Sequence, residues 1–338
     1  INNHLSHNMN ENYKWISNIK KLDFTDKSVA IVGGGRISQE HAKACMKLGI
    51  RDICMISKTG NTCSKFCEEN KIRIVTGGLE NNLTILNNFD LVIIATAIST
   101  LLHFAELIIS TGQKNILIEK PGSVNSKKLS EFKEKINGKN IKIGYNRFFY
   151  PSFHKLMECV KKDGGISSCR FSFTEMIDKI DFKKDISETY QKWGISNSSH
   201  VITMILELIG KPKEMFTSQF GSLEWHPSGA IFVGHGISEK NIPFSYHADW
   251  NGSGRWGIEI ATKDNLYLLS PLEKLFCCPK ASFEWKEVMV ESSFPEVKTG
   301  IAEEIAVMLT KERQEGIESI SISKTLDFNQ IIETVFGY

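Results

Sequence analysis

Short apolar runs alternate with amphipathic segments over the first 150 residues. The apolar runs have the length of buried strands and lie at 29–32, 52–56, 72–75, 91–95, 116–118 and 141–144. Between them, apolar residues recur at helical spacing in the segments 38–48, 62–70, 101–110 and 126–136. Strands that alternate with helices form a parallel sheet with helices on both faces. This pattern predicts a doubly wound α/β domain over 27–147, after an extension, 1–26, with one helix at 11–19.

Beyond residue 148, strand-length segments follow one another with few helices between them. Helices are predicted at 153–163 and in the apolar segment that ends near residue 210, and strands at 166–176, 214–219, 230–236, 244–250, 255–262 and 265–269. The segments 251–254 and 263–264 have the composition of hairpin turns, and helices at 301–310 and 327–335 close the chain. The pattern predicts an α+β domain over 148–338 with a large, mainly antiparallel open sheet.

A glycine-rich turn follows the first predicted strand. Gly33 allows a tight bend out of the strand, and Gly35 has no side chain to keep a pyrophosphate from the backbone. The next helix would point its N-terminal amides at the phosphates, with Arg36 and Ile37 at its start. Ser38 stands where the dinucleotide fingerprint has a third small residue. Three consecutive glycines also occur in ordinary loops, so the flanking strand and helix carry the prediction of a dinucleotide site.

The end of the second strand bears on which nicotinamide cofactor is bound. An NAD site usually has an acidic residue there, about 20 positions after the turn. This chain has Ser57, Lys58 and Thr59 instead, which would attract a 2′-phosphate. We therefore expect NADP(H) rather than NAD(H); alternatively, Lys58 is a solvated loop residue and NAD(H) binds without its usual acid. Thr96, after the fourth strand, is assigned to the same site.

The fifth predicted strand ends in Glu119, Lys120 and Pro121. A proline restricts the backbone of the residue before it, and a lysine in a dry, cationic pocket can have a pKa suited to proton transfer. Such a triplet alone is typical of a surface turn, but after a buried strand it lies at the sheet edge where ligands bind. Lys120 is therefore a catalytic candidate, with Glu119 orienting it or contacting the nicotinamide ribose.

Several motifs together resemble the glucose–fructose oxidoreductase/inositol dehydrogenase/MocA (Gfo/Idh/MocA) family. They are the glycine turn with His41 and Ala42, the Glu-Lys-Pro triplet, the run 144–147 and the later His200. The matching motifs span about residues 29–210. The resemblance implies hydride transfer between a nicotinamide and a secondary alcohol or ketone of a sugar, cyclitol or nucleotide-linked sugar, with Lys120 near the reacting carbon. It also implies a homodimer or homotetramer.

His200 is the acid/base residue that the resemblance implies, but the sequence near it departs from the family pattern. The family has an aspartate four positions before the histidine, where this chain has Ser196. An imidazolium is less stabilised without that carboxylate, although Ser196 or Asn197 could orient the ring. Asn146, Arg147 and Asn197 are expected to border the substrate. The alternatives are a structural histidine and, for the whole chain, a non-catalytic sensor that binds the cofactor.

The composition of the chain argues against a nucleic-acid-binding protein, a membrane protein and a metalloprotein. The formal net charge is only +2, from 41 basic and 39 acidic residues, so there is no electrostatic case for a nucleic-acid or membrane partner. No apolar run approaches the length of a membrane span, and we expect a cytoplasmic location. Eight cysteines with no CxxC pair, and no histidines at zinc spacing, indicate free thiols and no metal site.

Overall fold

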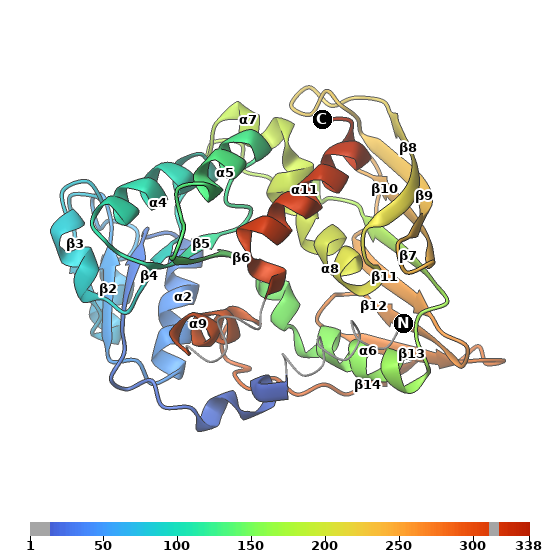
Figure 1. Cartoon of the computed structure of the whole chain (residues 1–338), viewed down its shortest axis with the longest axis horizontal. Coiled ribbons are helices and arrows are strands. Elements are labelled where there is room, and N and C mark those ends of the chain that lie inside the picture. The colour runs from blue at the N-terminus through green and yellow to red at the C-terminus, as the bar shows by residue number, and fades with distance from the viewer. Residues whose placement is uncertain (1–13, 311–317) are drawn as a thin grey trace. The chain divides into compact units, whose positions relative to one another are not determined.

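The computed structural model describes residues 14–310 and 318–338, which form two compact units (Figure 1). The first unit comprises Lys14–Phe149 and the described part of Ser293–Leu326, and the second comprises Tyr150–Ser292 and Asp327–Tyr338. Among the described helices, none is both long and apolar enough to cross a membrane.

A six-stranded parallel sheet forms the centre of the first unit. Its order is β3-β2-β1-β4-β5-β6, with strands β1 (Ser28–Val32), β2 (Asp52–Ile56), β3 (Arg73–Val75), β4 (Leu91–Ile94), β5 (Asn115–Glu119) and β6 (Asn140–Gly144). Every residue of β1 and β4 is buried, as expected for strands covered on both faces. The strand order reverses between β1 and β4, and ligands of such sheets bind at this switch point. The predicted doubly wound sheet is confirmed.

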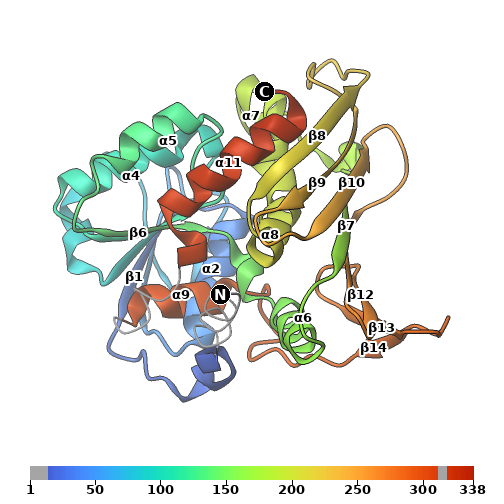
Figure 2. The ribbon, with the colours of Figure 1, turned by 45° about the vertical axis from the view of Figure 1, so that its right-hand side comes forward.

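Helices cover both faces of this sheet (Figures 1 and 2). One face carries α4 (Leu101–Ser110) and α5 (Ser126–Lys133), which contact each other, and the other carries α2 (Arg36–Lys47) and α9 (Ile301–Leu309). The remaining helical segments of the unit are α3 (Ser64–Asn70) and the 3-10 turns η1 (Lys14–Lys21), η2 (Leu83–Asn88), η3 (Ile98–Thr100), η4 (Asn146–Phe149) and η7 (Glu318–Ile320). The predicted helix at 11–19 falls partly on η1, and its first three residues lie outside the described part.

The compact units differ from the sequence-based domain boundaries at 147/148 and 26/27. Helix α9, far along the chain, belongs to the first unit, where all nine of its residues are buried and it packs on α2 and β5. Turn η1, which the sequence pattern places in an extension, belongs to the same unit and contacts α9. Sequence periodicity shows that a helix has an apolar face but not which surface buries it.

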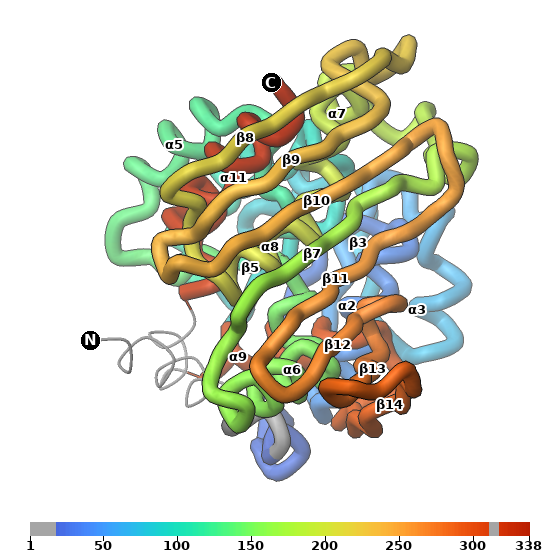
Figure 3. Tube along the Cα trace, turned by 90° about the vertical axis from the view of Figure 1, so that its right-hand side faces the viewer, coloured from blue at the N-terminus to red at the C-terminus, as the bar shows by residue number. Residues whose placement is uncertain are grey.

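The second unit is built on an eight-stranded sheet, seen face-on in Figure 3. Its order is β14-β13-β12-β11-β7-β10-β9-β8, and all neighbours are antiparallel except β10 and β7. The strands are β7 (Ser168–Phe173), β8 (Pro212–Phe220), β9 (Ile231–Ser238), β10 (Pro243–Asp249), β11 (Trp256–Ala261), β12 (Asn265–Leu269), β13 (Leu275–Pro279) and β14 (Lys286–Val288). The helical segments are α6 (Pro151–Lys162), η5 (Ile177–Lys179), α7 (Ser187–Gln191), the π-helical turn η6 (Gly194–Ser198), α8 (Ser199–Ile209) and most of α11 (Ile322–Phe336). The predicted large, mainly antiparallel sheet is confirmed.

One of the two predicted hairpins is wrong. Lys263 and Asp264 join β11 to β12, which pair antiparallel as predicted. Residues 251–254 join β10 to β11, but these strands do not pair, because β7 lies between them. Turn-forming residues report only that the chain bends. Strands β13 and β14 were not predicted; β14 has only three residues, Lys-Glu-Val, and shows no apolar alternation.

The eight-stranded sheet has one buried and one open face. Alternate residues such as Phe171 and Tyr246 are buried on the face that carries α8, whose residues are buried with one exception. The residues between them, such as Arg170 and Ser245, are exposed on the other face. All eight cysteines of the chain lie in the described residues and are free thiols, as predicted.

Candidate functional site

The glycine turn lies between β1 and α2, at the carboxyl edge of the parallel sheet. Gly33 has a φ of +124°, and a Cβ there would lie 2.4 Å from the carbonyl oxygen of Ala95, so a larger residue does not fit. A Cβ at Gly35 would meet no described atom within 4 Å. Gly35 also caps α2, and no described side chain caps that helix end by a hydrogen bond. Helix amides next to open space fit the pyrophosphate of a dinucleotide.

Two side chains that follow the glycines hold this turn in place. The Ser38 hydroxyl donates to the carbonyl of Ala95, at 2.9 Å, and so ties the first turn of α2 to the end of β4. Gln39 donates from its side-chain amide to the carbonyls of Gly34, at 3.1 Å, and Thr62, at 2.9 Å. Ser38 therefore performs the close-packing role of the third small residue. Gln39, which sequence reasoning missed, connects the turn to the loop after β2.

The loop after β2 presents the residues on which the cofactor prediction depends. Ser57 is buried and its hydroxyl accepts from the amide of Gly60, whereas Lys58 and Thr59 are exposed. Thr96, after β4, is half-buried and shares a 2.8 Å hydrogen bond with Thr100. The parallel strands β1, β2 and β4 are neighbours, so their carboxyl ends bring the glycine turn, Lys58 and Thr96 to one edge of the sheet.

Glu119 is the last residue of β5, and Lys120 follows it at the same edge. A carboxylate oxygen of Glu119 lies 2.6 Å from Nε2 of His41, a fully buried residue of α2. Burial is the largest single influence on Glu119 and opposes its ionisation, whereas the hydrogen bond and charge of His41 favour ionisation. The charges of Lys120 and Lys298 act in the same direction, and the net result is that the pKa of Glu119 is lowered.

Residues from the C-terminal part of the first unit complete this region, and sequence reasoning missed them. Glu304 of α9 is fully buried, and a Cβ at Gly144, the last residue of β6, would lie 3.6 Å from its carboxylate. Burial raises the pKa of Glu304 well above its usual range, and the Glu119 charge adds to the shift. The sequence does contain a signal that could have identified Glu304: a pair of glutamates in an otherwise apolar helix, IAEEIAVML.

Asn146 and Arg147, expected to border the substrate, lie in η4 after β6. Asn146 is buried and donates from its side-chain amide to the carbonyl of Thr299, at 2.8 Å. A Cβ at Gly300 would lie 2.1 Å from the carbonyl oxygen of Asn146, so the two segments pack closely. Arg147 is half-buried. Burial lowers the pKa of Lys298, and the nearby Arg147 charge lowers it further. The structure thus gives the Asn146 side chain a hydrogen bond to the backbone and places the charge of Arg147 near that of Lys298.

His200, in the second unit, lies in the first turn of α8. Its side chain is buried, and its ring centre lies 5.8 Å from that of Trp256. The Ser196 hydroxyl donates to the carbonyl of Thr189, at 2.6 Å, so its only proton serves the backbone. Asn197 donates from its side-chain amide to Glu175, at 2.9 Å.

Glu175, just after β7, supplies a carboxylate to the turn that precedes His200. It is 4% exposed and accepts hydrogen bonds from Asn197, from the Ser198 hydroxyl at 2.8 Å and from the Trp256 indole at 3.2 Å. Burial raises the pKa of Glu175 despite these bonds. Sequence reasoning looked for an acid one helical turn before His200 and missed this one, because it comes from a strand 25 positions earlier in the chain.

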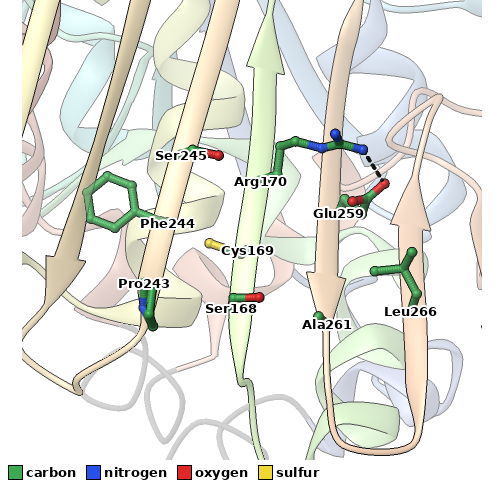
Figure 4. Close-up of a pocket in the computed structure, with 9 residues that line it drawn as sticks. All are labelled: Ser168, Cys169, Arg170, Pro243, Phe244, Ser245, Glu259, Ala261 and Leu266. Atoms are coloured by element: carbon green, nitrogen blue, oxygen red, sulfur yellow. Dashed lines mark hydrogen bonds and ion pairs between the residues drawn. The ribbon is translucent and has the colours of Figure 1, made fainter. Parts of the chain in front are cut away.

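A shallow groove crosses the open face of the eight-stranded sheet (Figure 4). It is lined by Ser168, Cys169, Arg170, Pro243, Phe244, Ser245, Glu259, Ala261 and Leu266. Arg170 reaches across to Glu259, at 2.9 Å, so the main charges of the groove neutralise each other. The groove lies on the sheet face opposite α8 and contains none of the residues predicted for catalysis or binding.

Comparisons with known proteins support this fold. The family model described as shikimate/quinate 5-dehydrogenase matches residues 16–136, most of the first unit. No curated protein sequence matches the chain. Among solved structures, the dehydrogenase MviM from Clostridium difficile has a TM-score of 0.75 at 15% identity, covering 92% of this chain and 99% of that one.

Two further solved structures are sugar dehydrogenases. UDP-N-acetylglucosamine 3-dehydrogenase from Acidithiobacillus ferrooxidans has a TM-score of 0.68 at 14% identity, covering 92% of this chain and 97% of that one. Levoglucosan dehydrogenase in complex with NADH and L-sorbose has a TM-score of 0.71 at 15% identity, covering 91% of this chain and 95% of that one. Similarity at this level of identity establishes the architecture. The chain therefore has the two-domain fold of the Gfo/Idh/MocA-type oxidoreductases, with a Rossmann-type unit followed by an open-sheet unit.

Proposed function

We propose that the protein is a nicotinamide-dependent dehydrogenase or reductase. It would transfer hydride between the cofactor and a secondary alcohol or ketone of a sugar, cyclitol or nucleotide-linked sugar. One observation carries the proposal: an open glycine turn and Lys120 lie at the same edge of one parallel sheet. The sugar-like substrate class is supported by the structural neighbours, which include a dehydrogenase bound to NADH and L-sorbose.

The bound nicotinamide cofactor would supply or accept the hydride. Different residues at the sheet edge would hold different parts of that cofactor. The backbone amides at Gly33, Gly35, Arg36 and Ile37 would hold the pyrophosphate. Ser57, Lys58 and Thr59 would hold the adenosine ribose, and Thr96 and Glu119 the nicotinamide end. Because Lys58 is exposed at the end of β2 and no acid follows that strand, we propose NADP(H) over NAD(H).

Lys120 is the proposed acid/base residue of the reaction. It would hold a proton at the substrate oxygen while that oxygen changes between hydroxyl and carbonyl. The lowered pKa of the neighbouring Glu119 keeps that carboxylate ionised, so that a negative charge lies beside the lysine. We also propose His200 as a hydrogen-bonding residue for the substrate, and Asn146, Arg147 and Asn197 as further substrate-binding residues. We further propose a homodimer or homotetramer in the cytoplasm.

The test is cofactor turnover followed by absorbance, with NADPH and NADH, against a panel of keto-sugars, cyclitols and nucleotide-linked sugars. Turnover of at least one panel member is expected, together with its loss in Lys120→Met, which keeps the side-chain length but removes the amine. Tight cofactor binding without turnover of any substrate would contradict the proposal and support the non-catalytic sensor. Light scattering of the same preparation measures the oligomeric state.

A further inference from the structure

Three titratable side chains from distant parts of the chain meet next to Lys120. They are His41 of α2, Glu119 at the end of β5 and Glu304 of α9, and their nitrogen and oxygen atoms lie within 4.8 Å of one another. His41 and Glu304 are fully buried. Neither oxygen of Glu304, nor Nδ1 of His41, has a hydrogen-bond partner among the described residues. An unpartnered carboxylate is costly at such a site, so a proton or a cation must compensate for its charge.

The geometry favours a proton over a metal ion. A zinc ion lies 2.0–2.2 Å from its nitrogen and oxygen ligands, which separates the ligand atoms by about 3.3 Å in tetrahedral geometry. The nitrogen of His41 and the oxygen of Glu119 are 2.6 Å apart, the distance of a strong charge-assisted hydrogen bond. The charges of Lys120 and Lys298 already act on Glu119, and they would repel a further cation.

We propose that Glu304 is a positioning residue for Lys120: it stays a neutral carboxylic acid and hydrogen-bonds Glu119 through one bridging water, which a separation of at most 4.8 Å accommodates. The hydrogen bonds from His41 and Glu304 would then hold the Glu119 carboxylate in one orientation beside the lysine. The inference rests on the proposed function, in which Lys120 is the acid/base residue. It adds to that function a buried residue, about 180 positions away in the sequence, that supports Lys120 without touching the substrate.

The charge state of Glu304 matters because opposite charges raise the pKa of a lysine. With Glu304 neutral, Glu119 holds the only negative charge of the cluster, and His41 lies against it. A second negative charge would stabilise the ammonium form of Lys120 further and make it a weaker acid. The other charged groups near the cluster are Lys298 before α9, Glu303 on α9, Arg147 after β6 and Glu40 on α2. Burial is the largest influence on Glu304 and keeps its pKa raised in the presence of all of them.

Two substitutions in the 338-residue chain separate three roles of the Glu304 side chain, those of a hydrogen-bond donor, a negative charge and a space-filling group. Glu304→Gln keeps the shape and an N–H donor, so kcat and the pH dependence of turnover should remain close to those of the wild type. Glu304→Leu keeps the apolar packing but has no donor. We expect it to lower kcat by about tenfold to a hundredfold, the scale of a lost hydrogen bond to a charged group. The limb of the pH profile that reports Lys120 should also shift, while cofactor affinity stays unchanged.

Two results would overturn the proposal. Glu304→Leu with normal turnover and an unmoved pH profile would leave Glu304 a purely structural residue. If Glu304→Gln lowered kcat as much as Glu304→Leu does, Glu304 would act as an anion rather than as a hydrogen-bond donor. Elemental analysis of the purified wild type tests whether a metal ion, rather than a proton, compensates for the charge of Glu304. A stoichiometric metal in the wild type that is lost in Glu304→Gln would also overturn the proposal.

An infrared measurement tests the protonation of Glu304 without any turnover. The spectrum of the wild type minus that of Glu304→Gln at pH 7 should contain the carbonyl stretch of a protonated carboxylic acid. A carboxylate band in its place would refute the inference, even if Glu304→Leu does not fold. Because this readout needs no substrate, it separates failure of the inference from failure of the proposed dehydrogenase activity.

Discussion

Glu303, the neighbour of Glu304, allows the packing of α9 to be tested by the pH dependence of stability. The residue is 2% exposed, and burial raises its pKa from the ordinary value of 4.5 to about 7. Between these two values the native protein keeps a proton that the unfolded chain has released. Stability therefore falls as pH rises through this window. Below it, both states are protonated and the burial of Glu303 costs nothing electrostatically.

The magnitude follows from the two pKa values. A change from 4.5 to about 7 corresponds to about 3 kcal/mol, at about 1.4 kcal/mol per pH unit. Glu303→Gln keeps the shape of the side chain and removes its ionisation. We expect this variant to match the wild type in unfolding free energy near pH 4.5. It should become more stable than the wild type by about 3 kcal/mol at pH 8, with most of the gain appearing before pH 7.

Urea unfolding at pH 4.5, 6, 7 and 8 provides the measurement, followed by circular dichroism. Glu296→Gln serves as the matched control, because Glu296 belongs to the same C-terminal segment but its side chain is 59% exposed. Its effect on stability should be small and nearly independent of pH. If the wild type and Glu303→Gln differed by a constant amount at all four pH values, Glu303 would not be a buried, protonated acid, and α9 would not bury the face that carries it.

Three further substitutions test the proposed function. Lys120→Met should lower kcat by about a hundredfold or more, the scale of a positioned acid/base residue, with cofactor affinity by calorimetry nearly unchanged; wild-type turnover would remove Lys120 from the mechanism. Lys58→Asp should reverse a preference for NADPH over NADH, because its carboxylate would repel a 2′-phosphate; equal affinities of the wild type for both cofactors would contradict this assignment. His200→Asn keeps a hydrogen-bonding group and should retain more turnover than Lys120→Met, and a melting curve would show whether a complete loss of activity comes from unfolding.

The sequence by itself determined the local elements of the Rossmann-type unit. Helix α4 was predicted with the bounds that it has in the structure, Leu101–Ser110, and β2 likewise at Asp52–Ile56. Both are bounded by residues whose effect is local, such as the glycine that follows α4. The glycine turn was predictable for the same reason, because the backbone conformation of Gly33 and the small side chain of Ser38 are properties of single positions.

The tertiary structure alone decided which elements meet. It inserted β7 between β10 and β11, where the turn residues suggested a hairpin. It also carried α9 back to the first unit, which brought Glu304 to Glu119. In the same way it brought the carboxylate of Glu175, from the segment after β7, to Asn197 and Ser198 in the turn before His200. Local patterns depend on the period and conformation of neighbouring residues, whereas these contacts depend on which apolar surfaces bury one another, and that is a property of the whole fold.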